Sequence, residues 1–378
     1  MIVRSDALII NLIIFFALVQ IYVVFFNYQN GPLLGAIATF IYLIMVLVSV
    51  ATLKVKRWNN LIFYILILYT LYLTFLNFNN SYDFFRSIFV TPYLFLAYSF
   101  PFTIVFFNGN SLKKIHNSIS IMNLIFIIIT FLKFSDLINN RVEFVQKWEN
   151  LLIFIGMSNF FSLLFIEDLA KRQKILSIIV YFLGILVSLY LARRGSVLTH
   201  IVFIPLFLIN LYLYYKKNIK MYIYVFIMTI ISLVIYSFFW DKISINFIER
   251  LSEDSRSMIL DDFFNDMSLS DYIFGKGIGG IYKISSINMF DGSYRNIVEA
   301  GYLNILLYGG LNLLLLLIFI NLFILLKSMG KEKLYPYLFY IIFIDIQGFY
   351  AGVYFFSLSF LIFWYCIYVC VRFKEGVK

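Results

Sequence analysis

The sequence predicts an all-α, polytopic transmembrane helix bundle that forms a single integral membrane domain over residues 1–378. Composition is the first reason, because 62% of the residues are hydrophobic and only 13% are charged, a balance far from that of soluble domains. The second reason is that apolar runs recur along the chain at lengths near the roughly 20 residues that a helix needs to cross a bilayer. The third is that basic residues fall in alternate connections between these runs.

Hydropathy predicts about twelve spans, in an order that gives the chain two unequal parts. Nine spans follow one another through short connections, and a long hydrophilic stretch at 241–299 separates them from the last three. The predicted spans are 7–26, 33–53, 60–78, 87–107, 117–134, 150–167, 175–192, 197–215, 219–240, 300–326, 334–350 and 352–371.

Basic residues set the predicted orientation of these spans. The positive-inside rule assigns the lysine-rich connections, and with them both termini, to the cytoplasm. Residues 241–299 are then one large extracytoplasmic loop, and the net charge of +10 reflects topology rather than binding of nucleic acid. The basic groups on this side are Lys54/Lys56/Arg57, Lys113/Lys114, Lys171/Arg172/Lys174, Lys216/Lys217/Lys220, Lys327/Lys331/Lys333 and Arg372/Lys374/Lys378.

Basic residues on the outer face are mostly arginines, in contrast to the lysine-rich inner face. A guanidinium group holds phosphate through two parallel hydrogen bonds, whereas an ammonium group acts as a point charge. The enrichment therefore indicates phosphate recognition at the outer face. The alternative is that long outer loops cross the membrane regardless of charge, and that their arginines pair with nearby acidic residues.

Two adjacent arginines lie in the short connection "YLARRGSVLTH" between predicted spans. Arg193 and Arg194 have no acidic residue within that connection, and Gly195 permits a close turn beside them. A cation at the edge of the hydrocarbon usually faces a water-filled cavity, an acidic partner or an anionic ligand. The pair predicts an anionic ligand approaching from outside, and snorkelling to lipid head groups is the alternative.

The long outer stretch contains two organised segments. Residues 243–264 have apolar positions at helical spacing, which predicts one or two amphipathic helices on the membrane surface. Arg250 and Arg256 are six residues apart, so they share a face only if the helix breaks near 252–255. The following "FGKGIGG" resembles a phosphate-binding loop only superficially, because the Gly-Lys-Ser/Thr ending is missing. No nucleotide is expected there.

The order of these features resembles the O-antigen polymerase and ligase superfamily, in particular bacterial polysaccharide repeat-unit polymerases of the Wzy type. The resemblance rests on the arginine-containing short loop, on "FGKGIGGIY" within the large loop and on "EAGYLNILLYGGLNLLLLL" at the next span, and it covers roughly residues 191–317. It implies a glycosyltransferase C-like membrane fold in the bacterial inner membrane. It also implies polymerisation of undecaprenyl-pyrophosphate-linked oligosaccharide units, with no cofactor and no metal. The implied partners are this lipid-linked substrate, membrane lipid and a chain-length regulator protein.

The resemblance carries over to particular residues. Arg193 or Arg194 matches the arginine of the short loop, and Arg256 matches the one upstream of the glycine turn. Glu299 takes the position of the histidine of the ligase branch, which argues against a histidine-dependent ligase. The spaced Arg-and-Gly motif of some polymerases, with ten intervening residues, is absent here.

The predicted site combines these residues with general chemistry. Arginines would stabilise the pyrophosphate leaving group, and a carboxylate would deprotonate the attacking hydroxyl. The expected catalytic residues are Glu299, Arg256 and Arg194, with Asp291 or Asp254 as substitutes for Glu299. A salt bridge to Arg295 is the alternative role for Glu299. The expected substrate-binding residues are Arg193, Arg194, Arg250, Arg256, Arg295, Gly277, Gly279 and Tyr302.

Other functions remain open at the level of sequence. A lipid-linked oligosaccharide flippase would use charged residues at mid-membrane, and Asp345 and Gln347 in the eleventh predicted span are the residues of that kind. A ligase or a purely structural membrane protein are further alternatives. Cys366 and Cys370 lie one turn apart within the last span, a spacing and setting that predict neither a disulfide framework nor a metal site.

Overall fold

The computed structural model is mostly helical, as expected of an all-α membrane protein. Among the residues that the structure describes, four helices are long and apolar enough to cross a membrane: α7 (Ser111–Leu132), α11 (Lys171–Tyr190), α12 (Arg194–Tyr215) and α17 (Gly301–Ser328). The structure describes residues 5–26, 107, 111–135, 141–191, 193–216, 255–277, 280–284, 294–295, 298, 300–350 and 357–372, with single positions at 37, 41, 44, 65, 66, 68, 69, 72, 73 and 76. The predicted spans 33–53, 60–78, 87–107 and 219–240 lie wholly or mostly outside these residues.

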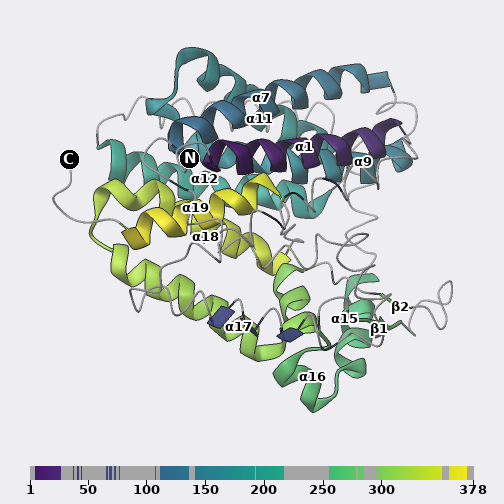
Figure 1. The fold of residues 1–378 in the computed structure, drawn as a ribbon. Helices are drawn as coiled ribbons and strands as arrows, with labels where there is room; N and C mark the ends of the chain where they lie inside the picture. Colours follow the sequence, from purple (N-terminus) through teal and green to yellow (C-terminus); the bar gives the residue numbers. More distant parts are fainter. Residues whose placement is uncertain are drawn as a thin grey trace.

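The described helices form a bundle with one helix at its edge (Figure 1). α1 (Ser5–Phe26) packs against α7, α7 against α11, and α11 against α12. α18 (Tyr335–Tyr350) lies between α12 and α19 (Leu358–Arg372), and α17 runs along the edge in contact with both α18 and α19. The connection from α17 to α18 contains the short 3-10 helix η6 (Glu332–Leu334).

The predicted span 150–167 is not one continuous helix. The chain forms α9 (Arg141–Phe154), the 3-10 helix η3 (Gly156–Ser158), α10 (Asn159–Leu164) and the 3-10 helix η4 (Ile166–Asp168). α10 is buried and contacts α7, α11, α12 and α18. A Cβ at Gly156 would lie 2.8 Å from Leu152 Cδ1, so the absence of a side chain permits the close packing at this interruption. Periodicity alone did not reveal it because the residues on both sides are equally apolar.

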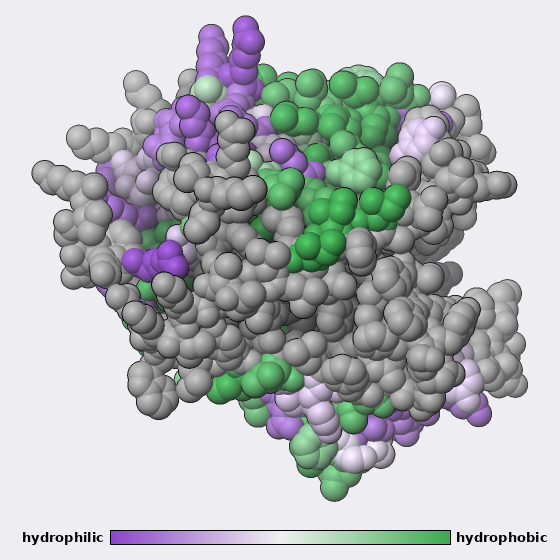
Figure 2. All heavy atoms as spheres, in the orientation of Figure 1, coloured by the Kyte–Doolittle hydropathy of each residue, from purple (hydrophilic) through white to green (hydrophobic). Residues whose placement is uncertain are grey.

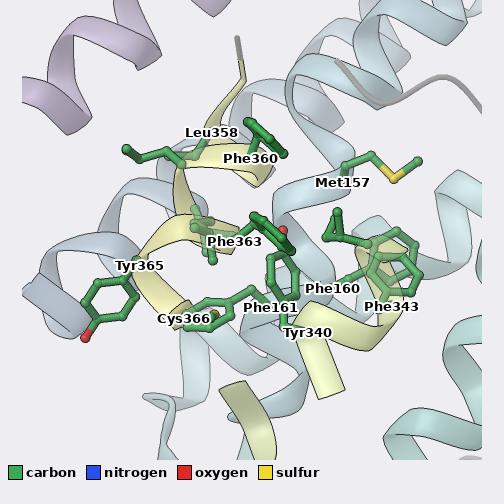
Figure 3. Packing of buried hydrophobic residues seen from close by; sticks show 14 of the residues in the cluster. Met157, Phe160, Phe161, Tyr340, Phe343, Leu358, Phe360, Phe363, Tyr365 and Cys366 are labelled. Carbon is green, nitrogen blue, oxygen red and sulfur yellow. The ribbon is translucent and has the colours of Figure 1, made fainter. Parts of the chain in front are cut away.

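Aromatic side chains fill the space around α10 (Figure 3). The ring of Phe160 lies 4.7 Å from that of Phe343 and 4.8 Å from that of Phe203, and the ring of Phe161 lies 5.2 Å from that of Tyr340, edge to face. These centroid separations are those that aromatic pairs prefer. The high phenylalanine content therefore serves helix packing in this part of the molecule.

Buried polar side chains also link the helices. Asn123 of α7 donates to Asn159 Oδ1 of α10 at 2.7 Å, and Asn159 donates to the Ser177 carbonyl of α11 at 2.8 Å. Asn210 of α12 donates to the Leu164 carbonyl at 2.7 Å. Hydrogen bonds of this kind hold membrane helices together because lipid offers no competing partner.

One end of the bundle collects five of the six basic groups, and the sixth, Lys54/Lys56/Arg57, lies outside the described residues. Lys114 pairs with buried Asp6 at 2.6 Å, which joins the first turns of α7 and α1. At the same end Gln173 donates to Asn117, Tyr215 donates to Asp168, Lys216 pairs with Glu332, and Lys327 donates to the Val371 carbonyl. Figure 2 shows hydrophilic side chains at the left end of the bundle and apolar side chains over its middle. A charged end beside an apolar band is the pattern expected of helices that cross a membrane.

The described part of the long hydrophilic stretch contains two helices and a strand pair. α15 (Ser255–Asp266) and α16 (Leu269–Phe274) are followed by β1 (Tyr282–Lys283), which pairs antiparallel with β2 (Tyr294–Arg295). Phe263, Tyr282 and Ile284 are buried against Leu307 and Tyr308 of α17. These elements form a second, smaller core, here called the outer module (α15, α16, β1 and β2), which packs on the first segment of α17.

Candidate functional site

α17 is bent at Gly310, whose backbone (φ 61°, ψ −167°) is not helical. The segment before the bend, 301–309, and the segment after it, 311–328, run in different directions (Figure 1). A positive φ is readily adopted by glycine but is strained for residues with a side chain. The "YGG" of the sequence therefore encodes the bend.

The turn that follows α16 docks into this bend, backbone against backbone. A Cβ at Gly275 would overlap the carbonyl group of Tyr308, and a Cβ at Gly310 would overlap the carbonyl group of Ile273. Gly275 also has a positive φ, of 77°. The two glycine motifs, 35 residues apart in sequence, are thus complementary halves of one contact.

Hydrogen bonds compensate for the interrupted helix. Three carbonyl groups at the bend accept hydrogen bonds. The carbonyl of residue 307 accepts from Lys276 N (2.7 Å), and that of residue 308 accepts from Gly277 N (3.0 Å). The carbonyl of residue 309 accepts from the Tyr69 hydroxyl (3.0 Å). Buried backbone groups without partners destabilise a fold, and in a membrane water cannot supply the missing partner. The "FGKG" backbone thus supplies two of the donors that the bend requires.

Lys276 is held by the protein itself. Its Nζ lies 2.5 Å from Asp266 Oδ2 and 3.0 Å from the Asp266 carbonyl, and its side chain is 18% exposed. This contact ties the glycine turn to the end of α15. The lysine of "FGKGIGG" therefore has a positioning role in the outer module.

Asn304 fixes the chain immediately before α17. Its Oδ1 accepts from Val298 N at 2.5 Å, and its Nδ2 donates to the Val298 carbonyl at 2.6 Å. Its own backbone N–H donates to the Ala300 carbonyl at 3.1 Å. The residues on either side of position 299 are thereby held to the first turns of α17.

Arg193 has an acidic partner, although the short connection itself contains no acidic residue and an anionic ligand was expected. Its guanidinium pairs with Glu149 of α9, 44 residues earlier in the chain, and both side chains are about one-third exposed. The expectation considered only the connection itself, whereas the partner comes from a neighbouring helix. An ion pair of this exposure leaves the arginine within reach of a ligand at the bundle end.

A carboxyl group lies between the two segments of α17. Asp345 of α18 accepts from Asn321 Nδ2 at 2.7 Å and is also hydrogen-bonded to the Tyr302 hydroxyl. The Tyr302 ring packs on Phe349, with centroids 4.6 Å apart, and Gly348 leaves room for it. An acidic side chain inside a membrane bundle is costly and usually marks a functional site.

The end of α18 connects Tyr302 to the arginine-containing connection. The position of a Cβ on Gly195 lies 4.0 Å from the Tyr350 carbonyl, and the Tyr350 hydroxyl donates to Thr199 Oγ1 at 3.3 Å. Phe349, the residue before it, contacts Tyr302. The bundle end opposite the basic groups therefore brings together three helix ends: the start of α12, the end of α18 and the start of α17.

The predicted site residues are only partly within the described chain. Arg295 pairs with Tyr282 across the strands, and its side chain is half-buried. Glu299, Arg250 and Gly279 lie outside the described residues, as do Asp254 and Asp291. Arg194 begins α12 and Arg256 lies in the first turn of α15, but the structure describes only the backbone of these two residues.

Several residues of this region were not predicted. Tyr69, Asn304 and Asn321 make the contacts described above, and Glu149 provides the partner of Arg193. Polar residues inside apolar spans were the available signal, because each needs a partner within the membrane. A polar residue in an apolar span indicates that a partner exists, but the sequence does not identify that partner.

Metal ligation has no candidate in the part of the chain that the structure describes, where no three His, Cys, Asp or Glu side chains group together. His200 is buried, and its Nδ1 donates to the Ser196 carbonyl at 2.7 Å.

Comparison of the chain with protein-family models, with curated proteins and with solved structures finds no match.

Proposed function

We propose that this protein polymerises undecaprenyl-pyrophosphate-linked oligosaccharide repeat units at the outer face of a bacterial cytoplasmic membrane. One observation carries the proposal: the segments that resemble the polymerase superfamily, far apart in sequence, are linked in space, two of them directly and the third through the end of α18. The glycine turn docks at the bend of α17, and the first turn of α17 reaches the start of α12 through Phe349 and Tyr350.

The proposal includes the orientation predicted from the sequence. It has about twelve spans, residues 241–299 on the outer side and both termini in the cytoplasm. Contacts that gather five basic groups at one end of the bundle support this orientation. Arg193 and Tyr302 then lie near the outer end, where a lipid-linked glycan would arrive.

In the proposed reaction, a hydroxyl group of the new lipid-linked unit attacks the anomeric carbon of the growing glycan. The bond from that carbon to the pyrophosphate oxygen breaks, and the electron pair leaves with undecaprenyl pyrophosphate. Arginines near the outer end, Arg193, Arg194 and Arg256, would stabilise the developing charge. The proton of the attacking hydroxyl would pass to a carboxylate, for which Glu299 is the candidate.

Asn304 gives this assignment a structural basis, because it holds the residues before and after position 299 to α17. A general base must remain within hydrogen-bonding distance of the proton that it removes. Fixing the flanking backbone at both sides would meet that requirement.

A transporter of lipid-linked oligosaccharide is the second candidate, and Asp345 favours it. The carboxyl group lies within the bundle between α17 and α18, as the charged residues of transporters do.

The test uses purified protein in vesicles with lipid-linked repeat units extracted from the cells that produce it. The polymerase proposal expects longer lipid-linked glycans together with released undecaprenyl pyrophosphate, and no requirement for nucleotide. Movement of the lipid-linked unit across the bilayer without elongation would identify a transporter. Transfer onto an acceptor other than a second repeat unit would identify a ligase.

A further inference from the structure

We propose that α16 and the glycine turn after it enter the outer leaflet of the membrane, and that Leu269, Ile273 and Phe274 contact lipid acyl chains. These residues belong to the stretch that hydropathy assigns to a water-exposed loop. The inference concerns how the outer module meets the bilayer, and it holds whatever reaction the protein catalyses.

Side-chain exposure is the first observation. Leu269 is 79% exposed, Phe274 is 48% exposed and Ile273 is 39% exposed. Leu269 and Ile273 are four residues apart and therefore share one face of α16. Figure 2 shows apolar side chains at the tip that α16 forms in Figure 1, with hydrophilic side chains beside them. A contiguous apolar face of this kind marks contact with a membrane or another apolar surface.

The polar residues at the start of α16 are used within the protein. Ser268 Oγ accepts from Asp271 N at 3.2 Å, and the Asp271 carboxylate accepts from Ser268 N at 3.0 Å. This reciprocal capping satisfies two backbone donors that a helix otherwise leaves exposed. The first turn of α16 can therefore lie at the level of the head groups while its apolar side chains reach deeper.

Continuity with α17 identifies lipid as the partner. The backbone carbonyl group of Ile273 lies against Gly310, so the exposed side chain of Ile273 projects next to the start of the second segment of α17. The residues of α17 that follow this contact are a row of exposed apolar side chains, with Leu311 43%, Leu315 59% and Phe319 56% exposed. α17 is one of the four helices able to cross a membrane. The apolar face of α16 thus extends a surface that the bilayer already covers.

The level of α16 agrees with this contact. Along the direction of α1 in Figure 1, α16 lies within the length of that helix, and β1 and β2 lie nearer the level of its end. Non-helical backbone is tolerated at membrane depth only when its polar groups are satisfied by protein. The three carbonyl groups at the bend of α17 meet that condition, because the glycine turn and Tyr69 donate to them.

The test measures the accessibility of single nitroxide labels on the full chain in vesicles of phosphatidylethanolamine and phosphatidylglycerol. Labels are attached to Leu269→Cys and Ile273→Cys, with Leu315→Cys as the lipid-facing control and Tyr294→Cys of β2 as the aqueous control. The two native cysteines, Cys366 and Cys370, are buried, and labelling of the unsubstituted protein gives their background. Oxygen reports on lipid exposure, and a water-soluble nickel chelate reports on exposure to water.

We expect the ratio of oxygen to nickel accessibility at 269 and 273 to match that at 315 and to exceed that at 294 several-fold. A ratio at 269 and 273 equal to that at 294 would place α16 in water and overturn the proposal. Low accessibility to both reagents would also overturn it, since the face would then be covered by protein, such as a second copy of the chain. Because 269 is highly exposed, its substitution leaves the packing of the outer module intact, and it decides the outcome if the variant at 273 does not fold.

Discussion

The bundle around α10 and the outer module both have cores of buried side chains, but the outer module also meets α17 through a direct contact between two backbones. Around α10, large side chains pack ring against ring, as Phe160 does on Phe343 and Phe161 does on Tyr340. At the outer module, main chain meets main chain at Gly275 and Gly310, with no side chain between the two segments. A core of large side chains relaxes partly when one is removed, whereas two backbones in direct contact have no rotamer that can make room.

The comparison separates two ways of losing function. Damage to the bundle should lower stability throughout the protein, because α10 contacts α7, α11, α12 and α18 at once. Damage to the glycine contact should release the outer module from α17 and leave the bundle folded. Four substitutions test this separation, from the largest expected effect on folding to the smallest.

Gly310→Ala should have the largest effect. The left-handed backbone alone costs roughly 1–2 kcal/mol for a residue with a side chain, and the new Cβ would also overlap the Ile273 carbonyl group. We expect a total above about 4 kcal/mol, seen as rapid proteolysis within α15 and α16 of the membrane-inserted protein.

Gly330→Ala is the matched control for that variant. Gly330 also has a positive φ, of 79°, but nothing lies within 4 Å of its Cβ position. It should show the backbone strain alone and no proteolysis of the outer module. Equal proteolysis in both variants would mean that strain, rather than the close contact with α16, accounts for the effect of Gly310→Ala.

Phe160→Ala should come second, because it removes a fully buried ring that contacts Phe203 and Phe343. The expected loss is about 3–5 kcal/mol, measured as a lower thermal midpoint of the whole protein in detergent. Phe319→Ala is the control, since that ring is 56% exposed on α17 and its removal should change the midpoint little. Equal shifts in the two variants would contradict a core centred on α10.

The sequence predicted the helices better than their contacts. The predicted spans 300–326 and 334–350 agree closely with α17 and α18, because a long apolar run has few alternatives to a membrane helix. The interruption at Gly156 was missed because equally apolar residues flank it. The antiparallel pairing of β1 with β2 was missed because each strand is only two residues long.

The candidate site was less predictable for a physical reason. Glycine motifs at 275–280 and 309–310 were both visible, but the sequence does not encode which backbone each one approaches. The partner of Arg193 was missed because Glu149 comes from another helix, and periodicity reports only neighbours within the same helix. Tyr302 was predicted as a substrate-binding residue. The hydrogen bond between its hydroxyl group and Asp345 was not predicted, because it depends on the bend of α17.

Asn304→Ala should have an intermediate effect, confined to the start of α17. It leaves both polar groups of the Val298 backbone without their partner, at a cost of about 1–3 kcal/mol for each buried group left unsatisfied. Glycan transfer should fall more than stability if Asn304 positions Glu299, with kcat reduced and KM nearly unchanged. Asn304→Asp retains the acceptor for Val298 N and should recover part of the rate; no recovery would argue against this positioning role.

Arg193→Lys should have the smallest effect on folding, and it is the variant that best separates stability from function. The ion pair with Glu149 is about one-third exposed on both sides, and pairs of this kind contribute about 1 kcal/mol or less. If Arg193 holds the pyrophosphate group, lysine cannot reproduce the two parallel hydrogen bonds, and glycan transfer should fall on the order of 10²–10³-fold, as on loss of a single transition-state donor. Glu149→Gln is the matched control, because it removes the acidic partner while leaving the guanidinium in place. It should lower the thermal midpoint at least as much as Arg193→Lys, which keeps the positive charge, and retain most of the transfer rate. Equal losses of transfer in the two variants would mean that the ion pair itself is required, and Arg193 would then be a structural residue of the bundle end.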